Sequence, residues 1–116
     1  MRLTSILALT ISLTALTGCH SPYVTTTVSN HTPTSVTLVE VDYPSASFGA
    51  DALAAGADYH YRFKILGDGP TKLLWTDAAQ QSHTVSGPNL NEGQEGTLTA
   101  TITPTTATWQ SNLRSN

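Results

Sequence analysis

The sequence has little charge and almost no cysteine. Of its 116 residues, 11% are charged and 7% are aromatic, and 5 basic residues face 8 acidic ones. So few basic residues argue against a nucleic-acid partner, because binding to phosphates needs a concentrated basic surface. The single cysteine, Cys19, excludes an intrachain disulfide and any site with several cysteine ligands. A low charge is also unlike a solvated disordered chain, and this length predicts one folded domain.

The first residues are typical of a secretory signal peptide. Arg2 supplies a positive charge, and the following residues, 3–16, carry none. This mostly apolar run is too short to span a bilayer, which needs about 20 apolar residues. We therefore expect residues 1–18 to be a signal peptide that the mature protein lacks.

The signal peptide leads to a motif in which small residues precede the cysteine, Leu16-Thr17-Gly18-Cys19. The motif resembles the lipobox of bacterial lipoproteins. The resemblance implies that a peptidase recognises Leu16, Thr17 and Gly18 and cuts before Cys19, whose sulfur carries the lipid. His20 follows, where an Asp would favour the inner membrane, so the resemblance implies an outer-membrane protein facing the periplasm. The alternative is an ordinary signal peptide that leaves Cys19 free.

The lipobox resemblance also determines how far the domain lies from the membrane. Four residue steps from Cys19 to Tyr23 span at most about 14 Å. We expect residues 19–22 to be a short tether, residues 23–112 to be the folded domain and residues 113–116 to be a tail. The partners implied are the membrane, through lipid on Cys19, and a nearby envelope protein or glycan.

Alternation of apolar and polar residues predicts a β protein. In the segment 59–65 every odd position is large and apolar and every even one is polar, so Tyr61 and Phe63 would face inward and Arg62 outward. The other predicted strands are 24–29, 36–43, 72–77, 83–86, 97–102 and 107–110. Seven short strands separated by turn residues predict a single small antiparallel β-sandwich.

Two segments interrupt this regular pattern. The apolar positions change phase within 36–43, which indicates a β-bulge. Residues 46–58 are rich in Ala and Gly, and we expect a loop there that places Leu53 in the core.

Three stretches resemble immunoglobulin-like or fibronectin-III-like modules. They are Val28-Ser29-Asn30 before a polar turn, the segment 53–63 with its alternating aromatic residues, and the alternation over 96–102. The resemblance covers roughly residues 23–110 and implies an immunoglobulin-like fold but no functional residues. The two-cysteine bridge of antibody domains is missing, and a transthyretin-like sandwich would show almost the same pattern.

No pattern in the sequence indicates catalysis, a metal or a cofactor. The histidines are His20, His31, His60 and His83. Their spacing matches no metal site. The two glycines of the segment 67–69 precede a proline rather than a helix, which argues against a phosphate-binding loop. We therefore expect a protein that is not an enzyme and has no cofactor.

One arrangement of charges is a candidate surface site. His60, Arg62 and Lys64 share the outer face of one predicted strand, and Glu40 and Asp42 share a face of the strand predicted before it. If these strands are neighbours, the two rows pair, each pair contributing roughly 0.2–1 kcal/mol. The alternative is a small basic patch for an anionic lipid or a glycan.

The sequence thus predicts a lipid-anchored envelope protein whose β-sandwich is a non-catalytic binding or structural module. One alternative is an accessory lipoprotein of a secretion or assembly machine, which an exposed apolar patch or a free edge strand would favour. A second alternative is an envelope hydrolase or an inhibitor of one. A deep pocket holding a perturbed carboxylate or histidine would favour an enzyme.

Overall fold

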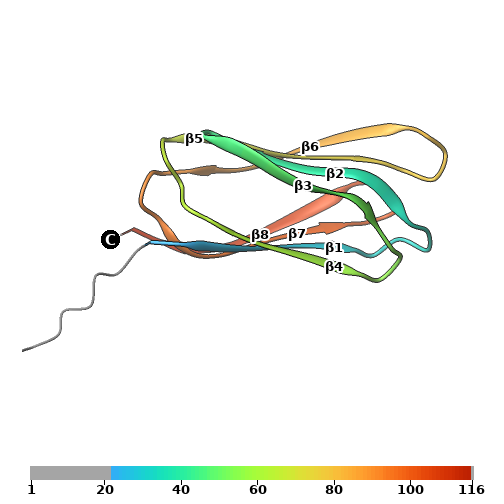
Figure 1. Ribbon diagram of the computed structural model, residues 1–116, viewed down its shortest axis with the longest axis horizontal. Helices are drawn as coiled ribbons and strands as arrows, with labels where there is room; N and C mark the ends of the chain where they lie inside the picture. Colours follow the sequence, from blue (N-terminus) through green and yellow to red (C-terminus); the bar gives the residue numbers. More distant parts are fainter. Residues whose placement is uncertain (1–21, 116) are drawn as a thin grey trace, which may run out of the picture.

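The computed structural model describes residues 22–115, which form a sandwich of two β-sheets (Figure 1). The strands are β1 (Val24–Asn30), β2 (Val36–Tyr43), β3 (Ala46–Leu53), β4 (Asp58–Phe63), β5 (Gly69–Thr76), β6 (Ser82–Leu90), β7 (Glu95–Ile102) and β8 (Ala107–Arg114). One sheet has the order β4-β1-β7-β8 and the other the order β3-β2-β5-β6. The structure confirms the predicted small all-β sandwich, and all seven predicted strands are present.

The eighth strand, β3, is the element that the sequence analysis missed. The segment 46–58 was expected to be a loop, but β3 pairs along the whole length of β2 after a two-residue turn at Pro44 and Ser45. The strand lies at the edge of its sheet, and Phe48 and Leu53 are its only buried side chains. An edge strand with so few buried positions needs no regular apolar alternation. Leu53 is 5% exposed and belongs to the core, as predicted.

The irregularity predicted in β2 is confirmed. The register between β2 and β5 shifts between Thr37 and Glu40. Leu38 lies in this bulge with a φ of 52°, and its side chain is 65% exposed. The bulge therefore turns Leu38 outward, so that Val36 and Val39 both reach the core.

The core lies between the two sheets and closes on one side with a cluster of aromatic rings. Phe63 is 4% exposed, and its ring centroid lies 4.3 Å from that of Tyr43. Phe48 of β3 stacks on Tyr61 of β4 at 4.2 Å, so the ring contacts connect the edge strands of the two sheets. Tyr61 was predicted to be a core residue, but its position on an edge strand leaves it 40% exposed.

The order of the strands differs from the immunoglobulin order. In immunoglobulin constant domains the first strand lies beside the second. Here β1 lies between β4 and β7, and β2 lies between β3 and β5. The pairing of β1 with β7 is parallel, whereas the other strand pairs are antiparallel. The hairpin that joins β2 to β3 occupies one side of β2, and β5 occupies the other, which leaves β1 to the second sheet.

Residues 22–115 contain no helix of the length and hydropathy that crossing a bilayer requires.

Candidate functional site

A pocket of about 240 Å³ opens between the loops at one end of the sandwich. It lies between the β1–β2, β5–β6 and β7–β8 loops, to which Thr32, Asp77 and Thr103 belong. The parallel strands β1 and β7 both end here, so the pocket lies at the opposite end from Tyr23, which precedes β1 (Figure 1). Loops that cluster at one end of a sandwich are a common place for binding sites.

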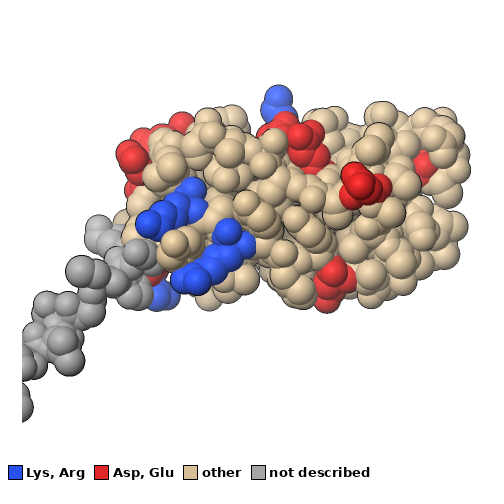
Figure 2. All heavy atoms as spheres, viewed as in Figure 1, with Lys and Arg blue, Asp and Glu red and all other residues tan. Residues whose placement is uncertain are grey.

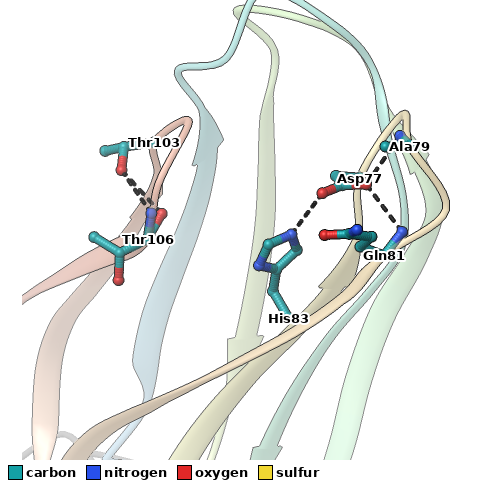
Figure 3. A network of polar contacts seen from close by, with 6 residues as sticks. All are labelled: Asp77, Ala79, Gln81, His83, Thr103 and Thr106. Carbon is teal, nitrogen blue, oxygen red and sulfur yellow. Dashed lines mark hydrogen bonds and ion pairs between the residues drawn. The ribbon is translucent and has the colours of Figure 1, made fainter.

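A carboxylate and an imidazole meet in the wall of this pocket (Figure 3). His83 Nε2 lies 2.7 Å from Asp77 Oδ2, and the two side chains are 29% and 30% exposed. The imidazole also stacks on Trp75, with ring centroids 4.9 Å apart and planes inclined by 11°. Asp77 Oδ1 accepts hydrogen bonds from the backbone N–H groups of Ala79 (2.9 Å) and Gln81 (3.0 Å). The same carboxylate thus fixes the β5–β6 turn and orients His83.

The hydrogen bonds at Asp77 determine which proton state the pair favours. The hydrogen bond from His83, then that from the Gln81 backbone, hold the pKa of Asp77 below its ordinary value of 3.8. A carboxylate only accepts, so His83 Nε2 is the donor and the second nitrogen of the neutral ring, Nδ1, is an acceptor. Within residues 22–115, Nδ1 makes no hydrogen bond, and in Figure 3 it points away from Asp77. When the ring is neutral, the pocket therefore offers a free, oriented acceptor to a ligand.

Asn30 shapes the opposite wall and is a residue that the sequence analysis did not single out as a site residue. It is fully buried at the end of β1. Its Nδ2 donates to the carbonyl oxygens of Thr34 (2.9 Å) and Leu53 (3.0 Å). Its Oδ1 accepts from the backbone N–H (3.0 Å) and the hydroxyl (2.7 Å) of Thr32. Because Thr32 and Thr34 line the pocket, Asn30 positions that wall.

The predicted basic row lies at the other end of the molecule and along β4. His60 contacts the hydroxyl of Thr27 on β1, with Nδ1 and Oγ1 3.0 Å apart. The guanidinium carbon of Arg62 lies 3.8 Å from the ring centroid of Tyr23, and the Lys64 ammonium nitrogen lies 5.0 Å from the same centroid. Arg62 and Lys64 are therefore brought together around one aromatic ring, whereas His60 has a separate partner.

The predicted pairing of this basic row with Glu40 and Asp42 is wrong. Those two residues belong to β2, which lies in the other sheet from β4. Asp42 lies opposite Lys72 on β5, and Glu40 lies opposite Leu74. The prediction assumed that strands close in sequence are neighbours, and the unpredicted strand β3 lies between them in the chain.

The lipobox residues Leu16, Thr17, Gly18 and Cys19, together with His20, lie outside the described residues. So do most of the proposed tether and the end of the tail, Asn116. Within residues 22–115, no three His, Cys, Asp or Glu side chains are arranged to hold a metal ion.

Fold and site together define a small all-β sandwich with a pocket between its loops. No protein-family model, curated protein or solved structure matches the chain.

We expect Asp77→Asn to destabilise the domain most above pH 3.8, and progressively less as the pH falls below 3.8 through the lowered folded-state pKa of Asp77. The folded-state pKa of Asp77 is lowered below the ordinary value of 3.8, so the ionised carboxylate stabilises the fold above that pH. This contribution is lost as the pH falls through the folded-state pKa. Thermal unfolding of both proteins across a pH series measures the effect. Asp51→Asn, which removes an exposed carboxylate from β3, is the control. A difference in unfolding temperature between the natural protein and Asp77→Asn that stays constant with pH would contradict the expectation.

Proposed function

We propose that this protein is a lipid-anchored component of the bacterial cell envelope, on the outer membrane and facing the periplasm. Its β-sandwich is a non-catalytic binding module at the membrane surface. The observation that carries the binding role is the pocket between the loops, which lies at the opposite end of the sandwich from Tyr23. A lipid on Cys19, four residues before Tyr23, holds one end at the membrane, so the pocket opens away from it.

The chemistry of the pocket supports a small, neutral, polar group as its ligand. Neither Lys nor Arg is among the described residues that line it, which argues against an anion. His83 Nδ1 accepts a hydrogen bond, while Pro33 and Pro104 supply apolar surface. A hydroxyl of an envelope glycan, or a hydroxyl or amide N–H of an envelope protein, meets these requirements.

We also infer a transthyretin-like rather than an immunoglobulin-like sandwich. Both topologies fit the sequence pattern. The position of β1 between β4 and β7, away from β2, supports the transthyretin-like topology. The immunoglobulin order instead places the first and second strands side by side.

We expect Cys19→Ser to abolish lipidation. The hydroxyl cannot replace the thiol as the acylated group, so unprocessed precursor or shed protein should accumulate. Metabolic labelling with radioactive palmitate, followed by fractionation of the membranes, measures both effects. Labelled palmitate that still enters the Cys19→Ser protein would overturn the lipoprotein assignment.

Crosslinking in intact cells tests where partners bind. A photoreactive amino acid at Ala79, on the exposed rim of the pocket, should capture a partner of defined mass. The same group at Gln110, on an exposed position of β8, is the control.

An accessory role in a secretion or assembly machine is favoured by the exposed Leu38 on β2. Crosslinks from position 38 instead of position 79 would support that role.

An envelope hydrolase is the second candidate, and the Asp77–His83 pair favours it. A carboxylate that orients an imidazole is an arrangement that general-base catalysis uses. However, no hydroxyl within residues 22–115 is hydrogen-bonded to His83 Nδ1, as a nucleophile would be. A screen of ester, phosphate, peptide and glycoside substrates tests the alternative. Turnover that His83→Ala abolishes would replace the non-catalytic proposal.

A further inference from the structure

We propose that the end of the sandwich at which β1 begins docks onto anionic lipid headgroups through Arg62, Lys64 and Leu66. The inference rests on the proposed lipid anchor, because lipid on Cys19 would bring this end to the membrane. It goes beyond that anchor in giving the domain a defined orientation.

Two cations gather at this end without a partner of opposite charge. Arg62 and Lys64 both lie against the ring of Tyr23, at 3.8 and 5.0 Å from its centroid. Both side chains are exposed, and neither forms an ion pair within residues 22–115. Figure 2 shows most of the basic side chains gathered at the left end of the molecule, with one apart from them at the top. Phosphate groups of anionic lipids would supply the missing opposite charge.

An exposed apolar side chain follows these cations. Leu66 lies in the β4–β5 loop and is 63% exposed, and among the large hydrophobic side chains within residues 22–115 Leu38 alone, at 65%, is more exposed. The loop is held in place where the backbone N–H of Gly93 donates to the carbonyl oxygen of Ile65 at 3.2 Å. An exposed apolar side chain that closely follows two cations in the chain, with an aromatic ring between those cations, is a combination suited to the interface of a bilayer.

Two of the acidic residues at this end, Glu95 and Asp68, have partners within residues 22–115. Glu95 is paired with Arg114, whose Nε lies 2.9 Å from its Oε1. Asp68 accepts a hydrogen bond from the backbone N–H of Glu92 at 2.7 Å. In Figure 2 most acidic side chains of this end lie above the basic ones, toward the sheet that contains β5. The β4 side is therefore the side that faces the lipid.

The test uses the lipidated full-length protein with an environment-sensitive fluorophore attached at Leu66→Cys. Acylation blocks the sulfur of Cys19, so only the introduced thiol reacts. The labelled protein is placed in vesicles of phosphatidylcholine alone or mixed with phosphatidylglycerol. We expect a blue shift with phosphatidylglycerol that high salt reverses. Each of Arg62→Gln and Lys64→Gln should lower the ratio of docked to free domain about fivefold.

Two controls isolate the docking surface. Lys72→Gln removes the same charge from an exposed position on β5 and should leave the shift unchanged. A label at Thr105→Cys, in the β7–β8 loop at the pocket end, should remain in water. Mass spectrometry that finds no lipid on Cys19 would refute the anchor and, with it, the docking. A lipidated protein whose Leu66→Cys label is equally hydrated in both vesicles would overturn the docking alone.

Discussion

Phe63→Ala will destabilise the domain by about 3–5 kcal/mol, the usual cost of truncating a buried aromatic side chain. Phe63 is 4% exposed, and its ring contacts Tyr43 of β2 and Phe48 of β3, so its loss opens a cavity between the two sheets. The free energy of unfolding in urea measures this cost. Tyr61→Ala should cost less, because that ring is 40% exposed.

Arg62→Ala is the matched control, one position away on the same strand. Its side chain is exposed and contacts the Tyr23 ring, a cation–π contact worth about 0.5–1 kcal/mol at such a site. We expect Arg62→Ala to lower the free energy of unfolding by no more than the energy of this contact. Equal losses for Phe63→Ala and Arg62→Ala would show that the two faces of β4 are wrongly assigned.

Asn30→Ala will cost about 2–5 kcal/mol, because four hydrogen bonds of a fully buried side chain are removed together. The carbonyl oxygens of Thr34 and Leu53 lose the hydrogen bonds from Nδ2, although the Thr32 hydroxyl still donates to Thr34. Asn30→Asp separates the two halves of the network, since a carboxylate keeps the bonds from Thr32 but cannot donate to those carbonyls. Chemical denaturation measures both variants, and the exposed Asn89 on β6 provides the control Asn89→Ala. If Asn30→Ala lowers the free energy of unfolding no more than Asn89→Ala does, the structural role of Asn30 is refuted.

The sequence predicted β4 because large side chains alternate there with polar ones. It did not reveal β3, whose Ala and Gly residues leave the two faces of the strand nearly alike. The condition for the two charge rows to pair, that their strands are neighbours, fails for the same reason, because the unpredicted strand changes which strands are neighbours. The alternation of apolar and polar residues within a segment predicts that the segment forms a strand. Which strands pair depends on how all of them pack around the core.

The site was less predictable than the fold. Asp77 ends the predicted strand 72–77 and His83 begins the predicted strand 83–86, but neither is a candidate site residue in the sequence pattern. Their contact depends on the short β5–β6 turn that brings the strand ends together, and the spacing across that turn was the available signal. Asn30 gave a weaker signal, because one of the carbonyl groups that it binds, that of Leu53, lies far away in the chain.

The parallel pairing of β1 with β7 has a consequence for how the protein is made. β1 occupies an interior position in its sheet, yet its neighbours are β4 and β7, so its second edge stays open until nearly the whole chain is available. Contacts so distant in sequence slow folding, because the long intervening segment must be ordered first. An exported chain would therefore leave the translocation channel as an unfolded polymer and fold only once its last strands have emerged. Truncation before β7 should leave an unpaired β1 edge, which is a target for aggregation and proteolysis.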